Sequence, residues 1–193
     1  MFSALNAVSY DIQYARKCTY NVITFNEQVG KWISRWNYSP DWMEECGIGM
    51  VSFKDGGIWI HDENNTRGSF YGDEYEATIT VIANQSPSQP KTFRNVQLES
   101  LNIWDSADSG DVTTPEGQSS SISEANYIKR NNQHFAPMLR DINTANRTDA
   151  LFNGNPMTST VLILKLNNSD TTPVKLFSVG VGYFDTNLSN FNG

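Results

Sequence analysis

The sequence comprises 193 residues with a formal net charge of −7, and its fourteen Lys and Arg residues are scattered rather than clustered. A continuous basic face for nucleic-acid phosphates is therefore disfavoured, and we predict no sequence-specific nucleic-acid binding. No stretch approaches the roughly 20 apolar residues that cross a bilayer, and the N-terminus lacks the basic and apolar regions of a signal peptide. We expect a soluble protein with no membrane span and no export signal.

Large side chains can form a core without covalent cross-links. The chain holds five Trp, ten Phe and eight Tyr residues, which is enough apolar surface for one domain of this length. Its two cysteines, Cys18 and Cys46, can form at most one disulfide bond. We expect both to be reduced and buried, as small apolar residues of a protein assembled inside a cell.

The first expected strands precede Pro40. Four apolar residues alternate with polar ones and share one face of an extended segment: Val8, Tyr10, Ile12 and Tyr14. The segment 31–38 repeats this two-residue period, with two tryptophans and a tyrosine on one face, and Pro40 ends it.

Residues 51–61 predict a tight hairpin. The pair Gly56-Gly57 accepts the positive φ angles that short hairpin turns require, and β-forming residues flank it on both sides. The runs 77–83 and 93–101 predict two further strands, separated by a loop that contains Pro87 and Pro90.

The segment 105–122 is almost without apolar residues. It is rich in Asp, Ser, Thr and Gly, and burial of such side chains offsets little of the entropy lost on ordering. We therefore predict a long mobile loop here, which could become ordered against a neighbouring subunit.

The last third of the chain predicts mixed structure. Residues 123–130 fit a helical turn or a bent strand, and residues 135–142 an irregular segment because of Pro137. The apolar run 160–166 and the alternating run 174–183 each predict a strand. The polar loop between them predicts that the two strands pair as a hairpin.

These elements predict an all-β fold, mainly an antiparallel β-sandwich with long loops. We expect an N-terminal strand or arm at residues 1–24, a sandwich domain at 25–185 with the mobile loop 105–122, and a tail at 186–193. The predicted core comprises large residues of the strands: Phe25, Trp32, Phe53, Trp59, Phe93, Val161, Leu162, Ile163 and Leu164. Deletion of the Trp59 side chain should then cost roughly 3 to 5 kcal/mol.

No group of residues predicts catalysis or metal binding. His61 and His134 lie far apart, with no Cys or carboxylate at a zinc-ligand spacing, and His61-Asp62-Glu63 fits a polar turn better than a cation site. Asp105, Asp108 and Asp111 depart from the spacing of an EF-hand loop. We expect no catalytic, cofactor-binding or metal-ligating residues, no cofactor and no enzymatic activity, although one sequence does not exclude a carboxylate pair for glycoside hydrolysis.

Several short motifs occur in a fixed order along the chain. They are Phe25-Asn26-Glu27, Lys31-Trp32, Gly57-Ile58-Trp59-Ile60-His61, Phe70-Tyr71-Gly72, Lys91-Thr92-Phe93 and Asn95-Val96. This order resembles tail proteins of crAss-like podophages, in particular the β domain of their muzzle protein. Looser matches follow at Leu139-Arg140-Asp141 and Leu151-Phe152-Asn153-Gly154. Muzzle-type proteins are generally longer than this chain, so it is either a separate small subunit or the terminal module of a longer protein.

The resemblance implies a structural virion component without enzymatic activity. It would multimerise around the tail axis, help to build or seal the exit channel, and be assembled in the cytoplasm of the host bacterium. The expected partners are other phage tail proteins and copies of itself, with host-surface contact also open. The alternative is a glycan-binding β-sandwich for host attachment, which would display tryptophans in a groove rather than in the core.

Overall fold

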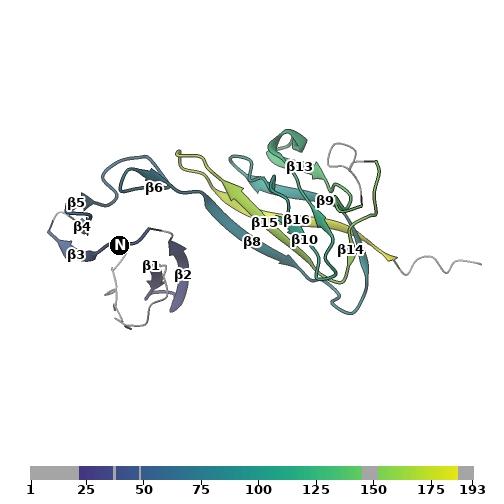
Figure 1. Ribbon diagram of the computed structural model, residues 1–193, viewed down its shortest axis with the longest axis horizontal. Coiled ribbons are helices and arrows are strands. Elements are labelled where there is room, and N and C mark those ends of the chain that lie inside the picture. Colours follow the sequence, from purple (N-terminus) through teal and green to yellow (C-terminus); the bar gives the residue numbers. More distant parts are fainter. Residues whose placement is uncertain (1–21, 37, 48, 145–151, 187–193) are drawn as a thin grey trace, which may run out of the picture. The chain divides into compact units, whose positions relative to one another are not determined.

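A computed structural model describes residues 22–36, 38–47, 49–144 and 152–186. The chain divides into two compact units, here called the N-terminal unit (residues 1–75) and the C-terminal unit (residues 76–193). Strands dominate both units, and the short 3-10 helix η1 (Glu124–Asn126) is the helical element among the described residues (Figure 1). Within these residues, no helix has the length and apolar character needed to cross a membrane.

The N-terminal unit is built from short antiparallel strands. The hairpin of β1 (Val22–Asn26) and β2 (Lys31–Trp36) forms one sheet, with a register shift at Thr24/Phe25. A second sheet has the order β3 (Trp42–Cys46), β4 (Gly49–Lys54) and β5 (Gly57–Ile60). The pair β6 (Ser69–Phe70) and β7 (Asp73–Glu74) forms a third.

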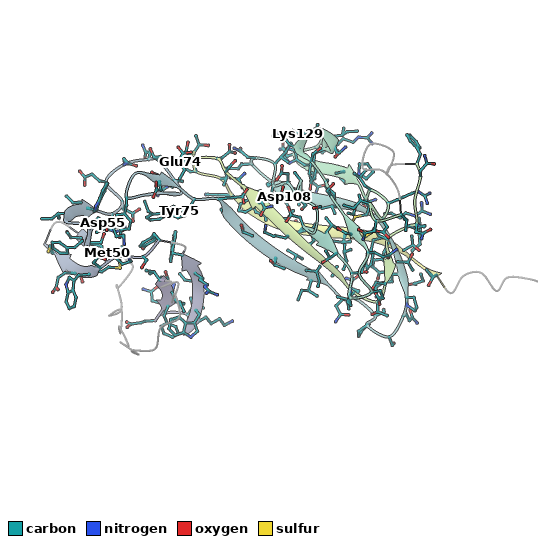
Figure 2. All side chains as sticks on the ribbon, viewed as in Figure 1. Met50, Asp55, Glu74, Tyr75, Asp108 and Lys129 are labelled. Carbon is teal, nitrogen blue, oxygen red and sulfur yellow. The ribbon has the colours of Figure 1, made fainter. Side chains whose placement is uncertain are left out.

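The predicted hairpin at residues 51–61 is confirmed, but its turn falls at Asp55-Gly56 rather than at the predicted pair Gly56-Gly57, because Gly57 already begins β5. Asp55, labelled in Figure 2, and Gly56 occupy the turn between β4 and β5 with φ angles of 50° and 77°. Two successive positive φ angles match the right-handed twist of the flanking strands, which explains why the turn is this short. The Asp55 backbone N–H also donates to the Asp41 carboxylate at 3.0 Å.

The C-terminal unit contains two larger sheets. The first has the order β11 (Ser119–Ser120), β10 (Val112–Thr113), β15 (Leu162–Asn168) and β8 (Ala77–Ala83). In the second, β9 (Lys91–Ser100) is central. It pairs on one side with β13 (Gln133–Pro137) and β14 (Thr158–Ser159), and it also pairs with β16 (Leu176–Asp185). β12 (Ile128–Arg130) extends the sheet beyond β13.

The core of the C-terminal unit lies between these two sheets. Alternate residues of β15, namely Leu162, Leu164 and Leu166, are fully buried, and they share the core cluster with Val96 and Leu98 of β9. The two-residue period of each strand places these side chains on its inner face. The predicted antiparallel β-sandwich is confirmed.

The predicted hairpin between 160–166 and 174–183 is wrong. β15 pairs with β8 on one side and β10 on the other, so it has no free edge for β16. β16 instead pairs with β9 in the opposite sheet. The connection crosses between sheets, and it is tied there by Asn102 Nδ2, which donates to the Asp170 carboxylate at 2.6 Å.

The expectation that the segment 105–122 gains little from burial is also wrong, whereas its mobility stays a prediction. The segment contains β10 and β11, and its Val112 and Ile122 side chains are fully buried. Its polar groups bond to distant parts of the chain: Ser106 Oγ donates to the Lys165 carbonyl at 2.5 Å, and Ser120 Oγ donates to the Leu139 carbonyl at 2.9 Å. These bonds satisfy groups that would otherwise be costly to bury.

Asp111 is the main anchor of this segment. Its carboxylate, 3% exposed, accepts a bond from Asn167 Nδ2 at 2.8 Å and lies 3.2 Å from Lys165 Nζ. It also accepts the Asp108 backbone N–H at 3.1 Å (Asp108 is labelled in Figure 2). A buried carboxylate with three donors is stable, so this aspartate secures β10 beside β15.

The predicted core is only partly correct. Phe93, Leu162 and Leu164 are buried, whereas Val161 and Ile163 are half-buried. Phe25 is also half-buried, and Trp32, Phe53 and Trp59 of the N-terminal unit are exposed. They are not core residues because the strands that carry them pack against few other elements of that unit.

Other predictions have mixed outcomes. Residues 123–130 form η1 followed by β12, but residues 135–142 are not wholly irregular, since β13 continues through Pro137. Cys46 is exposed rather than buried. The predicted strand at residues 8–14 and Cys18 lie outside the described residues, and the predicted domain boundaries stay a prediction.

Candidate functional site

A row of exposed apolar side chains crosses the three-stranded sheet of the N-terminal unit. Trp42 of β3 lies opposite Phe53 of β4, which in turn lies opposite Ile58 of β5. The exposed fractions of these residues are 63%, 39% and 69%. Directly opposite residues share a face of a sheet, so the three form a continuous strip, here called the apolar row. Ile60, also exposed, extends the same face.

The β1–β2 hairpin carries further exposed apolar residues. Trp32 packs edge-on against Phe25, with ring centroids 5.1 Å apart, yet it is 69% exposed. Ile23 and Ile33 are exposed as well. A two-stranded ribbon is marginally stable by itself, and a monomer seldom displays this much large apolar surface without a partner.

Beside the exposed residues, the N-terminal unit has a small aromatic cluster of its own. Tyr38 stacks on Phe70 with centroids 4.1 Å apart, and Trp36 and Tyr71 meet these two rings edge-on. Tyr38 is nearly fully buried, and this burial raises its pKa to about 12. The Phe-Tyr-Gly motif thus closes a local core.

Ser52, His61 and Tyr71 form a hydrogen-bonded chain next to this cluster. The Tyr71 hydroxyl donates to Ser52 Oγ at 2.9 Å, which leaves the Ser52 proton available to His61 Nε2 at 2.7 Å. Burial lowers the pKa of His61, against the opposing effect of Asp62, and favours the neutral imidazole.

This serine–histidine pair does not form a nucleophilic centre. Ser52 is fully buried and its oxygen already accepts the Tyr71 proton, so a substrate has no access to it. The pair instead holds Tyr71, whose φ angle of 57° places a bulky residue in the left-handed region. Sequence reasoning missed this trio, although the spacing of the Trp-x-His and Phe-Tyr-Gly motifs was its signal.

The other polar residues considered in the sequence analysis contact protein groups of the C-terminal unit. His134 is buried in the C-terminal unit, where Ser100 Oγ lies 3.4 Å from its Nδ1, and burial lowers its pKa. Asp105 joins an isolated bridge with Asn167, whereas Asp111 pairs with Lys165. Among the described residues, no three His, Cys, Asp or Glu side chains gather in a group that could hold a metal ion.

A groove of about 510 Å³ opens between β8 and β16 in the C-terminal unit. Its walls are largely apolar, and they include Val81 and Ala83 of β8 and Val179, Val181 and Tyr183 of β16. Lys91 lies at the groove with its Nζ donating to three backbone carbonyls of the loop 85–89, so its charge is fully bonded. None of the tryptophans lines this groove.

Comparison with known proteins identifies one segment of the chain. The family model of the Crassvirus muzzle protein C-terminal domain matches residues 65–141, less than half of the chain. This segment runs from the loop before β6 through β13, and it includes the Lys-x-Phe and Asn-Val motifs of β9. A search of curated proteins found no match. The match confirms the resemblance for the motifs within these residues: the chain carries a muzzle-type segment of the crAss-like phages, which supports a structural, tail-associated phage protein.

Proposed function

We propose that this protein multimerises around the tail axis of the virion and helps to build or seal the exit channel, through contacts rather than catalysis. The observation that carries the proposal is the apolar row of Trp42, Phe53 and Ile58, exposed in a chain of a structural phage family. Aromatic and aliphatic residues of this kind are typical of the buried centre of protein interfaces.

The apolar row is costly to leave in water. Burial of apolar area contributes roughly 25 cal/mol per Å². The N-terminal unit forgoes this contribution at the row, at Ile60 and at Trp32, because these residues are exposed. Contact with a neighbouring subunit would recover it, and it would also cover strands that otherwise invite aggregation.

The proposed partners are copies of this chain and other phage tail proteins, in virions assembled in the cytoplasm of the host bacterium. The apolar character of the row favours these over nucleic acid, whose recognition depends on a basic surface. Contact with the host surface stays a further prediction.

The glycan-binding alternative has weaker support. Exposed tryptophans are present, but sugar recognition also requires polar groups that bond to hydroxyls. Trp42 lies in line with Phe53 and Ile58, and its indole N–H already donates to Glu44 at 3.0 Å. This surface is better suited to another apolar surface than to a sugar.

Phage complementation tests the proposal. Ile58→Glu places a charge at the β5 end of the exposed row, where the isolated fold tolerates it but a buried interface does not. The matched control is Asn65→Glu, at an exposed loop position of the same unit. We expect the first variant to reduce incorporation into particles and infectivity at least tenfold, and the control to leave both unchanged.

Two results would contradict this function. One is the formation of normal, infectious particles that lack the protein altogether. The other is the hydrolysis of a polysaccharide by the purified chain, which would make it an enzyme.

A further inference from the structure

The sandwich of the C-terminal unit is open along one side. Among the described strands, β8 is the last of its sheet and β16 pairs with β9 alone, so the edges of these two strands border the same groove. The central strand β15 has five residues that are buried, whereas β8 has none. An open edge next to an apolar groove is the arrangement that accepts an added strand.

The hydrogen bonds of β15 show which backbone groups of β8 are free. The N–H groups of Lys165 and Asn167 donate away from β8, to the carbonyls of Asp111 and Asp105. Their partners in β8 are Thr80 and Thr78. In an antiparallel pair, residues that do not bond to each other point their N–H and C=O groups outward. Thr78 and Thr80 therefore offer donors and acceptors at the sheet edge.

The groove also specifies the side chains of an incoming strand. The inner face of β8 carries Ile79, Val81 and Ala83, opposite Leu166, Leu164 and Leu162 of β15. A strand beside β8 would continue this row and face Val179 and Val181 across the groove. It therefore needs about four apolar residues at alternate positions and polar residues between them.

The sequence contains a segment with this pattern outside the described residues. Val8, Tyr10, Ile12 and Tyr14 alternate with Ser9, Asp11, Gln13 and Ala15. The segment precedes Val22, the first described residue. Its flank carries Arg16 and Lys17, while the chain as a whole has a net charge of −7, so this flank favours binding to an acidic chain, which in the proposed multimer is another copy.

We propose that residues 8–14 of one copy add as a strand to the free edge of β8 in a second copy and fill the groove between β8 and β16. This inference rests on the proposed multimerisation and gives it a physical means. Backbone bonds to Thr78 and Thr80 would supply affinity, and the alternating apolar side chains would supply register.

The first test uses the full chain and sedimentation. Val8→Asn with Ile12→Asn removes the apolar face, and the matched control Ser9→Asn with Gln13→Asn makes the same replacement on the other face. We expect the first variant to weaken self-association at least tenfold and the control to leave it unchanged. Equal self-association of both variants and the parent chain would overturn the inference, although multimerisation itself would stand.

The second test leaves the protein unaltered except for its own segment. A synthetic peptide of residues 7–15 is titrated into the Val8→Asn, Ile12→Asn chain. Two further peptides of the same sequence are N-methylated, one on the amides of even-numbered residues and the other on those of odd-numbered residues. Only one alternate set can face β8, so we expect one methylated peptide to bind at least tenfold more weakly and the other to bind as the parent does. Equal binding of both, or no binding of the parent peptide, would overturn the proposal. A third contradictory result is a parent chain that is strictly monomeric while the Val8→Asn, Ile12→Asn chain binds the peptide. The segment would then fill the groove of its own copy.

A substitution in β8 gives an independent check. Thr80→Pro removes an outward N–H without removing a bond to β15, and Thr80→Val keeps the N–H. We expect the proline variant to keep its circular dichroism spectrum and lose peptide binding, while the valine variant keeps both. Unimpaired peptide binding by a folded proline variant would exclude the β8 edge.

Discussion

Strands in both units of this chain have the same two-residue pattern, but the two units differ in how far the apolar side chains of that pattern are buried. In the C-terminal unit, alternate residues of β9 and β15 meet between two sheets and are buried. In the N-terminal unit, the cross-strand partners Phe53 and Ile58 are exposed, although Val51 on the same face is buried. A two-residue period thus specifies a face of a strand, whereas the presence of a second sheet decides whether that face becomes a core.

The largest expected difference concerns the cost of truncating an apolar side chain in each unit. Leu164→Ala removes a fully buried side chain and should lower the free energy of unfolding by about 2–5 kcal/mol. Ile58→Ala removes an exposed one and should change it by less than about 0.5 kcal/mol. Urea denaturation followed by circular dichroism measures both. Equal losses would mean that the units do not differ as described.

The polar segment 105–122 extends this contrast, since several of its side chains are buried although its composition is hydrophilic. Asp111→Ala should cost about 1.5–3 kcal/mol, because it removes a buried, charged hydrogen-bond acceptor from Asn167 and Lys165. Asp108→Ala is the control, because the Asp108 side chain is exposed. If both variants melted like the parent protein, the proposed anchoring role of Asp111 would be wrong.

The exposure of Trp59 is intermediate between that of the buried Leu164 and that of the exposed Ile58. Trp59 is partly exposed but packs edge-on against Tyr71, with ring centroids 5.5 Å apart. We now expect Trp59→Ala to cost about 1–2 kcal/mol, less than the full burial of an aromatic residue would imply. A loss above about 3 kcal/mol in the same denaturation assay would place Trp59 in a core after all.

The smallest expected effect is a dependence on pH, with one histidine in each unit. Burial lowers the pKa of both His61 and His134, so the unfolded chain binds more protons as the pH falls below about 6.5. The free energy of unfolding should therefore decrease from that pH towards the lower folded-state pKa.

For His61 the decrease should be at most about 1 kcal/mol, because water screens this partly exposed group. His61→Gln should remove that part of the slope and leave the part due to His134. Denaturant melts between pH 7 and pH 5 measure the difference. An unchanged slope in the variant would show that the imidazole of His61 titrates normally.

Local features of the fold could be predicted from the sequence. The strand at 77–83 was predicted with the bounds of β8, because a β-branched run between turn residues is a local signal. The hairpin at Asp55-Gly56 was equally local. The choice of strand partners was not, and β16 was assigned to β15 although its ladder is with β9.

The burial of polar residues in the segment 105–122 could not be predicted either, because it depends on partners far away in the sequence. Asp111 and Asn167 are 56 positions apart, so composition within 105–122 gave no sign of the bond between them. Removal of this segment would delete β10 and the fully buried Val112, so the segment is part of the folded C-terminal unit. The apolar row was visible as a pattern, but exposure depends on what packs against it.

If the proposed function is correct, neighbouring subunits cover the apolar row in the virion. Hydroxyl-radical footprinting with mass spectrometry tests it directly, by comparing the oxidation of Trp42 in the isolated chain and in purified virions, with the buried Trp104 as an internal reference. We expect Trp42 to be oxidised readily in the isolated chain and to be protected at least fivefold in virions, while Trp104 stays protected in both. Equal oxidation of Trp42 in the two samples would contradict the claim.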